Sequence, residues 1–153
     1  MAAEYLANAV QTVSLNAPII FTASIPCTKG YVYHEDETGI FILRGIVNNP
    51  CANFATYQVT FNGNIAVPDG GTVPADGIAV AITVNGEPRL TSKAIIVPAA
   101  AGDYGNVTST AIIKVPRGCC FSISIDNIPA LSGSADAGAI NVQNANLVVS
   151  RLA

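Results

Sequence analysis

The sequence contains few residues with the chemistry of a catalytic or metal-binding site. Its one histidine, His34, is followed directly by Glu35, Asp36 and Glu37. An imidazole beside carboxylates could transfer protons or bind a metal ion. Such a run of charged side chains is more typical of a solvated loop, and we interpret the cluster as one.

The four cysteines, Cys27, Cys51, Cys119 and Cys120, do not form a zinc motif, because they lack the close pairwise spacing or the histidine partners of such sites. We expect free, buried thiols, with a disulfide between Cys27 and Cys51 as the alternative. Neighbouring residues of a strand point to opposite faces, so a bond between Cys119 and Cys120 would distort the backbone.

The remaining polar motifs are typical of turns. Asp69-Gly70-Gly71 and Asp76-Gly77 lack the recurring carboxylates of a calcium loop. Asn106-Val107-Thr108 matches a glycosylation sequon, but a sequence rich in asparagine produces this pattern by chance. Catalysis needs a nucleophile, a base and an orienting group, and no such set is evident. The sequence therefore predicts no catalytic residues, no metal site, no cofactor and no enzymatic activity.

Charged residues make up only 11% of the chain, whereas apolar residues make up 50%. Soluble domains usually carry about 25% charged residues. We expect much of such a surface to be covered by copies of the same chain, which indicates a structural oligomer. The net charge of −3 and the scattered basic residues argue against nucleic acid as a partner. No apolar stretch is long enough for a membrane span.

The length of 153 residues fits one domain, residues 1–153. Glu4 stands where a secretory signal would carry positive charge, and no apolar signal core follows. We therefore expect synthesis in the host cytoplasm without a signal peptide, followed by release through lysis or within an assembled particle.

Strand signals recur along the whole chain, and helical periodicity is confined to one turn around Ala2–Ala9. The expected strands are Val10–Leu15, Ile19–Thr22, Gly39–Val47, Ala55–Val67, Ile78–Val84, Lys93–Val97, Val107–Val115, Cys119–Ile125 and Ile140–Leu152. Asn85-Gly86 predicts a hairpin turn, and the apolar final strand is expected inside a sheet. This pattern predicts an all-β fold, an antiparallel jelly-roll sandwich of about eight to ten strands.

Alternation within these strands predicts the core side chains. They are Val59, Phe61, Ile82, Ile113, Phe121, Ile123, Leu147 and Val149.

Four stretches of the sequence carry short motifs beyond simple alternation. Asn106–Asn127 contains a strand that ends in Val-Pro-x-Gly and turns into an apolar strand that finishes on Asn. The others are Ala55–Val67, Ile78–Arg89 with its Asn-Gly pair, and Ile140–Ala153 with its Asn-Ala-Asn-Leu run. Taken in the order of the chain, the four stretches resemble strands of the tumour-necrosis-factor-like jelly rolls of bacteria and their viruses. The resemblance covers residues 55–153.

The resemblance implies a homotrimer packed around a three-fold axis through one sheet of each subunit. It implies a place on the exterior of a virion, as a capsid decoration or head-fibre protein of a tailed phage. The partner would then be the major capsid protein or another particle-surface protein. The alternative is a bacterial spore- or cell-surface adhesion module, and a third reading is a carbohydrate- or receptor-binding tip. The Gly-X-Y stalk of spore-surface proteins is missing, which favours the virion.

Two surfaces are predicted for assembly. One surface is the face of a sheet that meets the three-fold axis. Its side chains are either a small and polar set or those of the opposite face, represented by Tyr57, because the alternation of side chains along a strand does not tell which face is turned to the axis. The small and polar set comprises Gln58, Thr60, Cys120, Ser122 and Ser124. Residues 1–26 match the jelly-roll pattern least well, and we expect them to contact the capsid or a neighbouring subunit through Ile19, Ile20 and Phe21.

Overall fold

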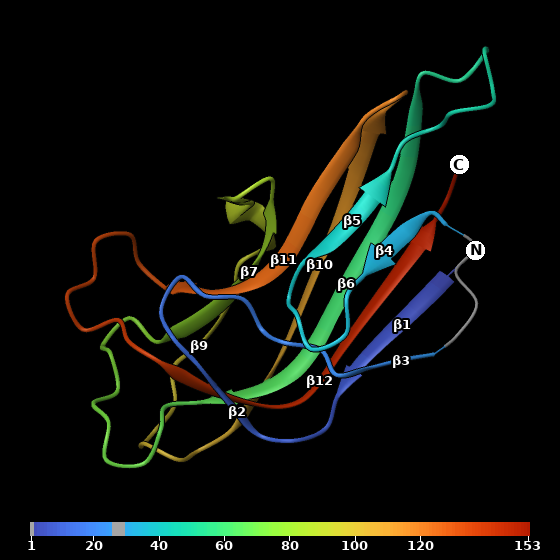
Figure 1. Ribbon diagram of the computed structural model, residues 1–153. Coiled ribbons are helices and arrows are strands. Elements are labelled where there is room, and N and C mark those ends of the chain that lie inside the picture. The colour runs from blue at the N-terminus through green and yellow to red at the C-terminus, as the bar shows by residue number, and fades with distance from the viewer. Residues whose placement is uncertain (1, 26–29) are drawn as a thin grey trace.

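The computed structural model describes residues 2–25 and 30–153, which form two antiparallel β-sheets packed face to face (Figure 1). Sheet A comprises β1 (Ala2–Ala7), β2 (Gln11–Val13), β3 (Ala23–Ile25), β6 (Phe54–Ala66), β10 (Gly105–Pro116) and β12 (Ile140–Arg151). Sheet B comprises β4 (Val32–His34), β5 (Phe41–Arg44), β7 (Ile78–Val84), β8 (Glu87–Pro88), β9 (Ala94–Ile96) and β11 (Cys120–Pro129). The short 3-10 helix η1 (Leu90–Ser92) lies between β8 and β9.

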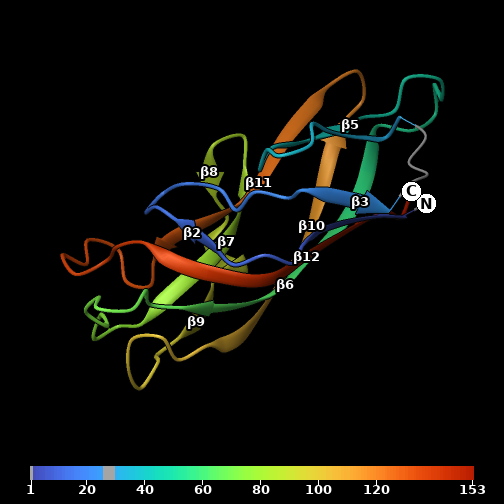
Figure 2. The ribbon, with the colours of Figure 1, turned by 60° about the horizontal axis from the view of Figure 1, so that its bottom comes forward.

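The strand order is β10-β6-β12-β1-β3 in sheet A, with β2 beside β12. In sheet B it is β4-β5-β11-β7-β8, with β9 beside β7. Strands distant in sequence are thus neighbours in both sheets, as a jelly roll requires, and the predicted fold class is confirmed. The long strands run along the molecule, and the loops before β7, β10 and β12 gather at one end (Figure 1 and Figure 2). In the described residues, no helix is long and apolar enough to cross a membrane.

The last strand of the chain lies in the middle of sheet A, as predicted. β12 pairs with β6 on one side and with β1 on the other. A bulge between Gln143 and Asn146 contains Asn144 at a positive φ of 54°, a conformation that asparagine tolerates. The extra residue keeps apolar side chains inward on both sides of the bulge. The Asn85-Gly86 turn also forms as predicted, with φ of 50° and 83° joining β7 to β8.

The N-terminal helical turn predicted from sequence is wrong, because these residues form β1. Ala3, Tyr5 and Ala7 are buried, whereas Glu4 and Leu6 are only partly covered, which is the alternation of a strand. Two of the three inward side chains are alanines, which contribute little to a period-two pattern and favour helices. Pairing with β12 overrides that local preference.

Residues 14–22 cross from one sheet to the other and close one side of the sandwich. The Ile19 amide donates to Ile125 O at 2.8 Å in sheet B, and the Thr22 amide donates to Leu6 O at 3.0 Å in sheet A. Ile19 and Phe21 are both 0% exposed. The predicted docking role of these two side chains is therefore wrong, because they fill the core of their own subunit. Ile20 points outward and is 43% exposed.

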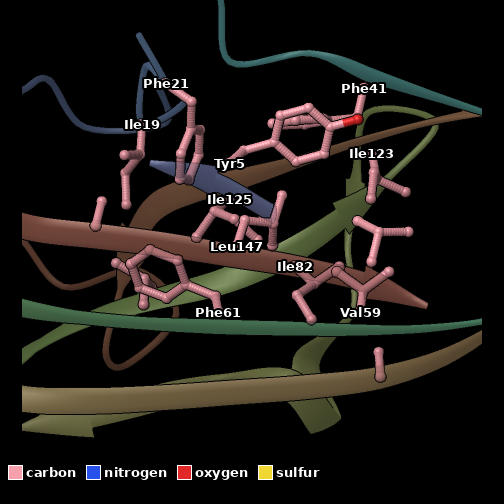
Figure 3. Close-up of a cluster of buried hydrophobic side chains, with 14 of the residues drawn as sticks. Tyr5, Ile19, Phe21, Phe41, Val59, Phe61, Ile82, Ile123, Ile125 and Leu147 are labelled. Carbon is pink, nitrogen blue, oxygen red and sulfur yellow. The ribbon is translucent and has the colours of Figure 1, made fainter. Parts of the chain in front are cut away.

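The core lies between the sheets and is built from the inward side chains of both (Figure 3). The structure places Val59, Phe61, Ile82, Ile113, Ile123, Leu147 and Val149 there, each at most 1% exposed. Tyr5, Phe21 and Phe41 form an edge-to-face cluster, with ring centroids of Tyr5 and Phe41 4.6 Å apart. Phe121 only packs against the edge of this core and stays partly exposed, because it lies near the start of β11.

Candidate assembly surface

The outward side of sheet A is an open face, which we call the assembly face. It consists of the side chains on β1, β12, β6 and β10 that point away from the core. Strand register aligns them in rows, namely Ala2–Ser150–Gln58–Ile112, Glu4–Val148–Thr60–Thr110 and Leu6–Asn146–Asn62–Thr108. Each row crosses four strands, since inward and outward side chains alternate along every strand.

Polar side chains on the assembly face bond to one another across the strands. Asn106 Nδ2 donates to the side-chain oxygens of Asn62 at 2.9 Å and of Asn64 at 3.1 Å. Thr108 Oγ1 donates to the same Asn62 oxygen at 3.1 Å. The hydroxyls of Thr60 and Thr110 lie 3.1 Å apart, and Thr110 reaches Val59 O at the same distance. Much of the polarity of this face is therefore satisfied within the sheet.

Charge is almost missing from the three rows, although the assembly face also carries Lys114 on β10, in the next row beside Thr56. Glu4 is their one ionisable side chain, and one of its carboxylate oxygens accepts a hydrogen bond from Asn146 Nδ2. Apolar contributions come from Leu6, Val148 and Ile112, the last being 48% exposed. Covering such a face costs little desolvation, because few charges or unpaired polar groups lose contact with water.

The predicted small and polar interface set is divided between the two sheets. Gln58 and Thr60 lie on the assembly face of sheet A. Cys120, Ser122 and Ser124 point to the outer side of sheet B, where Ser124 is 6% exposed and donates to Asp126 Oδ1 at 2.7 Å. The prediction that all five share one face is wrong. Alternation assigns a side of a strand, but it does not tell which sheet holds the strand.

Tyr57, the representative of the rival face, lies in the core at 0% exposure. Its hydroxyl donates to the main-chain oxygens of Arg44 at 2.5 Å and Tyr31 at 3.1 Å. A contact between Tyr57 and another subunit is therefore ruled out in this fold, and the assignment to an interface is wrong.

His34 is partly buried rather than in a solvated loop, which corrects the sequence-based interpretation. Its ring stacks on Phe41 with centroids 4.2 Å apart, and Nε2 lies 2.9 Å from Thr38 O. Glu35, Asp36 and Glu37 are exposed, as expected for a loop. The aromatic contact explains the position of His34, since the imidazole covers the edge of the core.

Three cysteines are exposed free thiols, contrary to the expectation that they are buried. These are Cys51, Cys119 and Cys120. Cys51 lies in the loop before β6, and the other two follow the turn after β10. Cys27 lies outside the described residues, and since Cys51 is a free thiol, the alternative of a disulfide between Cys27 and Cys51 is not formed.

No protein-family model matches the sequence, and no curated protein matches it. Solved structures match in fold. The globular domain of zebrafish complement 1qA protein is 11% identical, with a TM-score of 0.61 over 99% of this chain and 97% of that chain. The Eiger TNF of S. frugiperda is 14% identical, with a TM-score of 0.66 over 100% of this chain and 92% of that chain. At these identities the likeness concerns the fold, and it identifies the two packed sheets of this chain as a tumour-necrosis-factor-like jelly roll.

Proposed function

We propose that this protein is a non-enzymatic structural module that forms a homotrimer through its assembly face. The observation that carries the proposal is the combination of an open sheet with one charged side chain in three cross-strand rows. Only 11% of the residues are charged, so contact with another subunit is the main way in which this chain can shield its apolar surface from water. The resemblance to tumour-necrosis-factor-like jelly rolls implies an axis through one sheet of each subunit.

Sheet A suits this role better than sheet B. The outer side of sheet B is already partly covered within the subunit, where Ala79, Ala81 and Ile128 form a second buried cluster. Lys93 helps to hold this cover in place by donating to Ala130 O at 3.0 Å. A partner that binds to sheet B would have to displace the part of this subunit that covers the sheet. The assembly face needs no such rearrangement.

We further propose that the trimer decorates the exterior of a tailed-phage capsid, bound to the major capsid protein or another particle-surface protein. Support comes from the resemblance of residues 55–153 to phage and bacterial jelly rolls. Spore- or cell-surface adhesion is the competing location, and it uses the same trimer.

Electron microscopy of purified phage particles that carry this gene tests the location. Matched particles from a strain with the gene deleted serve as the control. We expect three-fold protrusions on the capsid exterior that disappear on deletion and return when the full-length protein is added. Identical capsid surfaces in both preparations would contradict the virion role, and recovery of the protein in a spore-coat fraction would favour the competing location.

A further inference from the structure

A cleft with two arginines lies where β5 and β12 end. The end of β12 is at the same end of the molecule as the start of β1 (Figure 1). We call it the arginine cleft. Its volume is about 340 Å³, and Tyr31, Arg44, Arg151 and residues 45–49 line it. This volume falls at the lower end of the range of small-molecule sites, which run from about 300 Å³.

The walls of the arginine cleft are held by the core. The Arg44 amide donates to Tyr31 O at 3.0 Å, and the buried Tyr57 hydroxyl bonds to the main-chain oxygens of both residues. Tyr57 is also the register partner of Arg151 across β6 and β12. One enclosed side chain thus ties Tyr31, just before β4, to Arg44 at the end of β5. A site built in this way loses little conformational freedom on binding.

The two guanidinium groups differ in their surroundings, since an oxygen of Ala153, the last residue of the sequence, lies beside Arg151. The Arg151 guanidinium carbon lies 4.1 Å from the centroid of the Tyr31 ring, and its Nε donates to the main-chain oxygen of Ala153 at 3.4 Å. Among the described residues that line the cleft, none is Asp or Glu, and Asn48 and Asn49 add neutral amides. Arg44 and the N–H groups of Arg151 other than Nε are available for an anion from solution, in a chain with a net charge of −3.

We infer that the arginine cleft binds a carboxylate-bearing sugar of about monosaccharide size. A guanidinium presents paired N–H groups that match the two oxygens of a carboxylate. The stacking of Arg151 on Tyr31 holds one such fork in a fixed direction. The Asn48 amide can both donate and accept hydrogen bonds, which suits sugar hydroxyls, whereas Asn49 adds an Nδ2 donor, because its Oδ1 accepts from the Cys51 amide at 3.0 Å. Apolar contact is available from Val47, which is 72% exposed.

Titration of the full-length protein with glucuronate tests the inference, with glucose as the matched ligand that lacks only the carboxylate. Binding is measured from chemical-shift changes at Tyr31, Asn48 and Asn49. We expect saturable binding of glucuronate in the millimolar range and none of glucose. Equal binding of glucose, or equal binding of inorganic phosphate, would overturn the assignment, because the cleft would then not be selective for a carboxylate on a sugar.

Arginine variants distinguish binding in the arginine cleft from a general effect of the protein's charge. We expect Arg44→Gln and Arg151→Gln each to weaken glucuronate binding by about tenfold or more, as for the loss of a charge-assisted hydrogen bond. Arg117→Gln is the control, because it makes the same charge change and Arg117 donates to Pro50 O outside the cleft lining. If Arg151→Gln does not fold, Arg44→Gln decides. Equal loss in Arg117→Gln, or no loss in Arg44→Gln, would overturn the inference.

Discussion

Aromatic side chains of this protein differ in how completely the sheets enclose them. Phe61 is 0% exposed at the centre of sheet A, whereas Phe121 is only partly covered at the start of β11. We expect Phe61→Ala to lower the free energy of unfolding by about 3–5 kcal/mol, the usual range for a buried aromatic. Phe121→Ala is expected to cost about half as much, since less apolar area is buried there. Reversible denaturation measures both, and equal losses would contradict the described packing.

Tyr57 gives the stability a dependence on alkaline pH. Burial raises the pKa of its hydroxyl above the ordinary value of 10.0, although the nearby Arg151 opposes this rise. Above pH 10.0 the Tyr57 hydroxyl loses its proton in the unfolded chain before it does so in the folded chain. The folded state therefore becomes less favourable as the pH increases. Below pH 10.0 both states keep the proton, and the effect disappears.

The comparison of wild type with Tyr57→Phe isolates this effect. Phenylalanine has no proton to lose, so the stability of the variant should fall less steeply between about pH 8 and about pH 11. The other side chains are the same in both proteins, so their contributions cancel in the difference. A difference in unfolding free energy that stays constant across this interval would show that Tyr57 is not held protonated by the fold.

The N-terminal strand and the crossing segment are structural elements of the sandwich. β1 covers one edge of β12, and residues 14–22 place Ile19 and Phe21 in the core. We expect a variant that begins at Cys27 to lose cooperative thermal unfolding, because it exposes a central strand and opens the core. A sharp thermal transition in that variant, with the far-UV spectrum of the full-length protein, would contradict this account.

Strand elements with large alternating side chains are predictable from this sequence, and elements that depend on pairing are not. Val59 and Phe61 of β6 identify their strand and its inward side directly. β1 is not predictable from the sequence, because Ala3 and Ala7 give only a weak alternation of apolar and polar side chains. Its strand conformation depends on pairing with β12. Ser122 and Ser124 were assignable to a side of β11 but not to a sheet. The assembly face could be predicted only in part, through Gln58 and Thr60, because the rows depend on register across four strands.

At the scale of the whole molecule, the proposed trimer can be tested by placing charge on the assembly face. Thr60 lies in the middle row, between Val148 on β12 and Thr110 on β10. Thr60→Lys should dissociate the trimer, since unpaired buried charges cost several kcal/mol each. Thr72→Lys is the matched control in an exposed loop and should leave the trimer intact. Dissociation of both variants, or of neither, would show that the assembly face is not the interface.

The molecular mass of the full-length protein in solution tests the central claim most directly. Native mass spectrometry at micromolar concentration, checked by light scattering, reports how many copies of the 15.7 kDa chain associate. A complex of three chains is the predicted result. A monomer would contradict both the proposed trimer and the explanation of the charge-poor composition, because the assembly face would then stay open to water.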